Sequence, residues 1–81
     1  MPRYYFHISM GSAYIHDYEG MELANDPAAR QWAIRDILAV WEASTVRCQN
    51  PVTCAVVVTD GTKELFRVPF VEAPGVLPKT N

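Results

Sequence analysis

The sequence predicts an α+β domain: a four-stranded, mainly antiparallel sheet with one helix packed on one face. Two pairs of short segments alternate apolar and polar residues or are rich in β-branched residues. One central segment repeats its apolar residues with helical periodicity, and turn residues separate the segments. The order strand–strand–helix–strand–strand (ββαββ) favours two hairpins joined through the helix.

The 81 residues have room for one domain with a single core. We place this domain at residues 1–72. Residues 73–81 contain two prolines and a glycine, so we expect them to form a flexible C-terminal tail.

The first predicted hairpin begins with a strand at residues 3–9, which places Tyr4, Phe6 and Ile8 on one face. The next three residues include a glycine and supply a turn. Residues 13–17 are then predicted to return as a short second strand.

A single helix is predicted from Asp26 to about Cys48. Asp26 can accept hydrogen bonds from the free amides of the first turn, and Pro27 has no amide group to leave unsatisfied there. Asn50-Pro51 stops the helix, because the residue before a proline avoids helical geometry.

Two apolar stripes are predicted on this helix. The first, which we expect to cover the sheet, consists of Ala33, Ile34, Ile37, Leu38 and Trp41. The second is placed on nearly the opposite side and consists of Ala29, Trp32, Val40 and Ala43. A second stripe indicates another subunit or a partner, with Trp32 as the anchor. The alternative is that Trp32 contacts the loop at residues 20–23 of its own chain.

The second predicted hairpin starts with the β-branched run Thr53–Thr59, which is typical of an interior strand. Asp60-Gly61 predicts a two-residue turn, and residues 63–70 return as a strand. Pro69 has no amide donor, so its end of that strand should lie at an edge or outside the ladder.

The charge and cysteine content limit the function classes. Seven basic and nine acidic residues give a net charge of -2, without the strong positive field of a non-specific nucleic-acid-binding protein. No apolar run is long enough for a signal peptide or a membrane span, so a cytoplasmic location is expected. Cys48 and Cys54 are then expected to be reduced thiols.

The opening residues Pro2-Arg3-Tyr4-Tyr5-Phe6-His7-Ile8 and the later Asp17-Tyr18-Glu19-Gly20-Met21-Glu22-Leu23 resemble a family of small bacterial proteins. Members of that family have an arginine-tyrosine-phenylalanine-histidine strand, an aspartate followed by a glycine turn, an alanine-rich helix and a final hairpin. The family is classed as a domain of unknown function, so the resemblance implies a fold and no activity. Trp32 and Trp41 depart from the family pattern.

Candidate chemistry centres on His7 and Asp17, whose strands can lie side by side. An imidazole held by an aspartate is the arrangement of a general base or metal ligand, but a strand histidine more often makes a structural hydrogen bond. No nucleophile or oxyanion motif accompanies the pair. His7, His16, Cys48 and Cys54 lack the spacing of a metal site. We therefore expect no catalytic residue, no metal and no cofactor.

The sheet face away from the helix is predicted to show Arg3, Tyr5, His7 and Arg67. Rings and positive charge on an open sheet are the pattern of sheet-based RNA-binding domains. The acidic balance opposes that function, and aromatic side chains on a strand also stabilise sheets through cross-strand pairs.

The sequence therefore predicts a small interaction or regulatory module without catalysis of its own. It would form a homodimer through the helix or an edge strand, or bind a protein partner, and it would have no contact with a membrane. A ligand- or single-stranded-RNA-binding sheet is the first alternative. An enzyme using His7 and Asp17 is the second.

Overall fold

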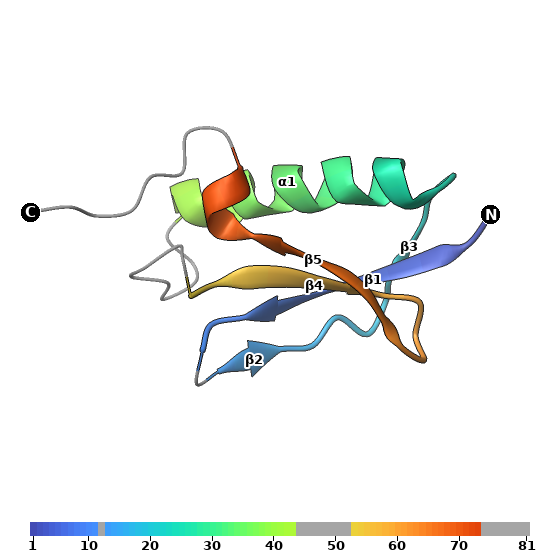
Figure 1. The fold of residues 1–81 in the computed structure, drawn as a ribbon, viewed down its shortest axis with the longest axis horizontal. Helices are drawn as coiled ribbons and strands as arrows, with labels where there is room; N and C mark the ends of the chain where they lie inside the picture. Colours follow the sequence, from blue (N-terminus) through green and yellow to red (C-terminus); the bar gives the residue numbers. More distant parts are fainter. Residues whose placement is uncertain (12, 44–52, 74–81) are drawn as a thin grey trace, which may run out of the picture.

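The computed structural model describes residues 1–11, 13–43 and 53–73, without the side chains of residues 42 and 43. The elements are β1 (Arg3–Ser9), β2 (Tyr14–Ile15), β3 (Met21–Glu22), α1 (Asp26–Ala43), β4 (Ala55–Thr59), β5 (Glu64–Pro69) and the short 3₁₀ helix η1 (Phe70–Glu72). The helix lies along one face of the sheet (Figure 1). The predicted α+β class, with one helix against a mainly antiparallel sheet, is confirmed.

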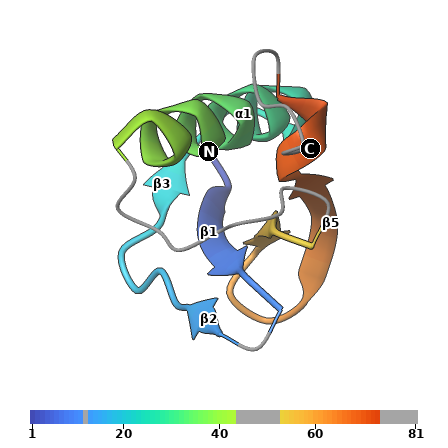
Figure 2. The same ribbon diagram turned by 90° about the vertical axis from the view of Figure 1, so that its left-hand side faces the viewer.

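The sheet has five strands where four were predicted. Its order is β2-β1-β4-β5, and β3 also pairs with β1. The predicted return strand at residues 13–17 is reduced to β2, which pairs with Ile8 and Ser9, while β3 pairs with Arg3 and Tyr4. Two short strands therefore share the outer edge of β1, and β2 is the strand farthest from α1 (Figures 1 and 2).

The core lies between α1 and the sheet, on the face that the strand alternation predicts. Phe6 pairs with Val58, which pairs in turn with Phe66, and Ile8 aligns with Val56 and Val68 in the same way. Because alternate residues of a strand share a face, this register gathers the apolar side chains on one side. The buried cluster is Tyr4, Phe6, Ile8, Ala29, Ala33, Ile37, Cys54, Val56, Val58, Val68, Phe70 and Ala73.

The prediction of two opposed helix stripes is wrong. Ala29 is fully buried together with Ala33, because residues four positions apart lie on the same side of a helix. Trp32 and Val40 are partly buried and pack against the same core. The helix thus has one broad apolar face, which packs against the core of its own chain. The side chain of Ala43 lies outside the described part of the chain.

The start of α1 also differs from the prediction in its cap. The side chain of Asn25, not that of Asp26, accepts the hydrogen bond from the Ala28 amide, at 3.0 Å. The Asp26 carboxylate instead accepts one from the Tyr4 hydroxyl at 2.8 Å. This bond fixes the helix start to β1.

The turn between β4 and β5 is longer than the predicted two-residue hairpin. The Asp60 amide donates to the Lys63 carbonyl, and the Asp60 carboxylate accepts from the amides of Thr62 and Lys63. The hydrogen bonds from Thr62 and Lys63 lower the pKa of Asp60 to about 2. The ladder shifts register beside this turn, between Val58 and Thr59.

Two further expectations change near the ends of the second hairpin. Cys54 is buried and disulfide-bonded, so the expectation of a reduced thiol is wrong for this residue. That expectation came from the expected compartment and the low number of cysteines, neither of which determines whether a particular thiol is paired. Ala73 is buried, so the core extends one residue past the predicted boundary. Cys48 lies outside the described residues, as do residues 74–81 of the predicted tail.

Candidate binding surface

The face of the sheet opposite α1 carries a continuous set of rings, which we call the aromatic cluster: Tyr5, His7, Tyr14, His16 and Tyr18. Tyr5 stacks on His7 with ring centroids 6.5 Å apart, and His7 stacks on Tyr14 at 5.6 Å. His16 lies 5.5 Å from His7, 4.7 Å from Tyr14 and 5.8 Å from Tyr18. The cluster joins the centre of the sheet to its β2 edge.

Tyr5 is held by two glycine turns. Gly20 and Gly61 have φ angles of +71° and +96°, a region that side chains strain to enter. A Cβ atom at Gly20 would lie 2.8 Å from Tyr5 Cε2, and one at Gly61 would lie 3.1 Å from Tyr5 Cε1. Only glycine therefore lets both turns approach the ring this closely.

His7 uses both ring nitrogens inside the protein. Its Nδ1 accepts a hydrogen bond from the Asp17 amide at 2.9 Å, and its Nε2 lies 3.3 Å from Thr59 Oγ1. An accepting Nδ1 assigns the neutral tautomer that carries its proton on Nε2. Burial and the nearby His16 lower the pKa of His7, against the opposing effect of Asp17. The imidazole is therefore uncharged at neutral pH.

The Asp17 carboxylate completes the edge of β1. Its Oδ2 accepts the Phe6 amide at 3.1 Å, between the residues that pair with β2 and those that pair with β3. Its Oδ1 accepts the amides of Glu19 at 3.1 Å and Gly20 at 3.2 Å. Burial alone would raise the pKa of Asp17, but these hydrogen bonds and His7 together hold it below its usual value.

His7 and Asp17 lie together in the structure, but their arrangement differs from that of a general-base pair. The imidazole contacts the Asp17 amide, while the carboxylate binds three backbone amides. A catalytic pair requires the carboxylate itself to orient the imidazole. The observed contacts fix the turn after β2 against β1.

The two predicted cations of this face are also engaged. Arg3 Nη1 donates to the Glu19 carbonyl at 2.6 Å. Arg67 donates to both carboxylate oxygens of Glu64, at 2.8 and 3.1 Å. A phosphate would have to compete with these partners. The four predicted open-face residues thus share one side of the sheet, but each already has a role within the chain.

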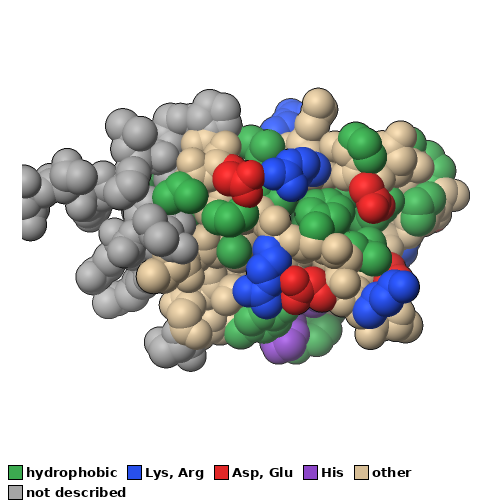
Figure 3. Space-filling model, in the orientation of Figure 1, with side chains coloured by type: hydrophobic (Ala, Val, Ile, Leu, Met, Phe, Trp, Pro, Cys, Tyr) green, Lys and Arg blue, Asp and Glu red, His purple; other side chains and the backbone are tan. Residues whose placement is uncertain are grey.

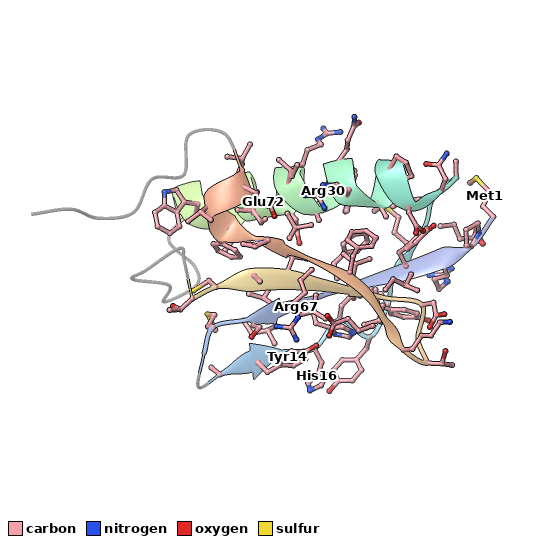
Figure 4. The ribbon with its side chains drawn as sticks, viewed as in Figure 1. Met1, Tyr14, His16, Arg30, Arg67 and Glu72 are labelled. Carbon is pink, nitrogen blue, oxygen red and sulfur yellow. The ribbon has the colours of Figure 1, made fainter. Side chains whose placement is uncertain are left out.

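The exposed part of the cluster consists of residues that were not among the predicted open-face residues. Tyr18 is 85% exposed and Tyr14 43%, and His16 is exposed between them. We call Tyr14, His16 and Tyr18 the exposed strip. Tyr14 lies close to Arg67, and His16 contacts Tyr14 (Figure 4). Figure 3 shows histidine at the lower edge among hydrophobic side chains. Their spacing of two residues was the available signal.

Of the residues predicted to form a helix interface, Trp32 is the one large side chain that is partly exposed. Trp32 lines a pocket of about 290 Å³ together with Gly20 and Met21. This agrees with the alternative that its own loop lies against it. No three potential metal ligands come together anywhere in residues 1–11, 13–43 and 53–73.

A family model described as Domain of unknown function (DUF6894) matches residues 3–71. The chain belongs to this family. No curated protein and no solved structure matches it. The described part of the chain contains no helix with both the length and the apolar character to cross a bilayer.

Proposed function

We propose that this member of the DUF6894 family is a small interaction module that pairs with a second copy through β2 and the exposed strip, without catalysis of its own. The observation that supports it is the exposed apolar surface at one edge of the sheet. Tyr14, Ile15 and Tyr18 are three of the five large hydrophobic residues that are exposed in the described structure. Tyrosine is enriched in the central contacts of protein interfaces.

Side chains would provide most of the binding energy. β2 has only two residues, so pairing it with another strand adds few backbone hydrogen bonds. Burying a large apolar side chain gains about 1.5–3 kcal/mol, and Tyr14 is already partly covered in the monomer. The cost of association offsets much of this gain, so two or more rings are needed for a stable dimer.

The charges next to the exposed strip favour a second copy over a nucleic acid. Arg67, which lies close to Tyr14, forms an ion pair with Glu64, so its positive charge is already paired within the chain. About a two-fold axis, two such surfaces meet with rings against rings and either charge available to the other copy. A phosphate backbone would require a net positive surface.

The test is sedimentation velocity over a concentration series, with Tyr18→Ala as the variant. We expect wild type to dimerise and Tyr18→Ala to weaken the dimer by about 2 kcal/mol, roughly 30-fold in Kd. Val71→Ala is the matched control, because Val71 is an exposed apolar residue on η1, outside the exposed strip. It should leave the Kd unchanged.

A wild-type protein that stays monomeric at millimolar concentration would contradict the proposal, as would equal effects of the two variants. Salt-dependent binding to a pool of single-stranded RNA, lost in Tyr18→Ala, would support the RNA-binding alternative instead.

A further inference from the structure

A pocket lies between α1 and the turn that follows β2. It has a volume of about 290 Å³ and is lined by Phe6, Asp17, Gly20, Met21, Trp32 and Asp36. Its walls combine an indole, a phenyl ring and a thioether with two carboxylates. Ligand pockets typically have mostly apolar walls; this one is slightly smaller than their usual range and the exposed surface of its walls is more polar than apolar, which suits a small charged group.

The two carboxylates of the pocket differ in what they already bind. The Asp17 carboxylate accepts three backbone amides, which keep it ionised. Asp36 is half-buried on α1, and its carboxylate makes no hydrogen bond or ion pair with any side chain in the described part of the chain. Burial and the negative charge of Asp17 raise the pKa of Asp36. The pocket therefore offers one carboxylate that a positive ligand would stabilise.

The indole of Trp32 is suited to the same kind of ligand. The guanidinium carbon of Arg35 lies 5.4 Å from the centroid of this ring, so the ring already attracts a cation on the helix surface. Arg35 is not among the residues that line the pocket. The pocket thus has an aromatic wall, a free carboxylate and apolar side chains, but no positive group of its own.

We propose that this pocket binds a primary ammonium or guanidinium group on a short alkyl chain. Asp36 would pair with the charge, the ring of Trp32 would lie against it, and Met21 and Phe6 would contact the alkyl chain. The group could belong to a free amine or to a lysine or arginine side chain of a protein. This site is separate from the exposed strip and does not depend on dimerisation.

The experiment is an NMR titration of ¹⁵N-labelled protein with n-butylammonium and n-butylguanidinium. We expect saturable shifts of the Gly20, Met21 and Asp36 amides and of the Trp32 indole N–H. n-Butanol, which has the same alkyl chain without the charge, should cause no saturable shift. Asp36→Asn should weaken binding about tenfold or more, because it removes a charge-assisted hydrogen bond.

Two further comparisons make the result specific. Glu22→Gln removes one negative charge from exposed β3 outside the pocket and should leave affinity unchanged, while Trp32→Leu should weaken it several-fold. The proposal is overturned if butanol binds as well as the amine, if no saturable shift occurs, or if Asp36→Asn and Glu22→Gln have the same effect.

A peptide with one lysine, compared with the same peptide carrying norleucine, distinguishes the two sources of the group. Tighter binding of the lysine peptide than of the free amine supports a side chain of a partner protein. The reverse order supports a small amine.

Discussion

Gly20→Ala is the sharpest test of how the aromatic cluster is held in place. The new Cβ atom would lie 2.8 Å from Tyr5 Cε2 and 2.9 Å from the Tyr4 carbonyl oxygen. The second of these atoms belongs to the backbone of β1, so it cannot move away without disturbing the central strand. The substitution also places alanine at a φ of +71°.

The chain provides a matched control for the dihedral cost. Gly11 has a φ of +78°, and a Cβ atom there would meet nothing within 4 Å. Gly11→Ala should therefore cost only the left-handed conformation, about 1–2 kcal/mol of unfolding free energy. Gly20→Ala should cost that amount plus about 1–3 kcal/mol for the clash, or about 2–5 kcal/mol in total.

Urea unfolding, followed by circular dichroism and tryptophan fluorescence, measures the unfolding free energy of both variants. Gly61→Ala should fall between them, because its Cβ atom would contact only the Tyr5 ring, at 3.1 Å. Equal losses of stability for Gly11→Ala and Gly20→Ala would refute the reasoning. They would mean that the turn after β2 does not press on β1.

Two other predictions concern the contacts between His7 and Asp17. Asp17→Asn replaces the charged acceptor of three amides and should lower the unfolding free energy by about 1–3 kcal/mol at neutral pH. Because the pKa of Asp17 is held below 3.8, the difference from wild type in urea unfolding should shrink as the pH falls through that lowered pKa. A difference that is constant with pH would contradict this role. The pKa of His7 lies below its usual 6.5, so the unfolded chain binds the proton more tightly and stability should decrease as the pH falls below 6.5. Urea unfolding of His7→Asn, which retains an acceptor, should lack this decrease, and an unchanged pH profile would show that His7 is not its source.

The sequence alone determined the elements with strong local signals. The alternation in residues 3–9 and the β-branched run before Asp60 produced β1 and β4, because one face of each strand must be buried. The same alternation placed Tyr5 and His7 on the open face. Family membership was also contained in the sequence, since it depends on motifs and not on packing.

Other features depended on contacts between distant residues. The predicted return strand is shortened to β2, and a separate strand, β3, follows it, because the Asp17 carboxylate takes the place of a strand partner at Phe6. The prediction of a second helix stripe was wrong because Ala29 lies four residues from Ala33 and shares its buried side of the helix. The Asp36–Trp32 pocket exists only where α1 crosses the turn at Gly20. Local patterns determine which faces are apolar, whereas side-chain partners far apart in the sequence decide which groups stay free to bind.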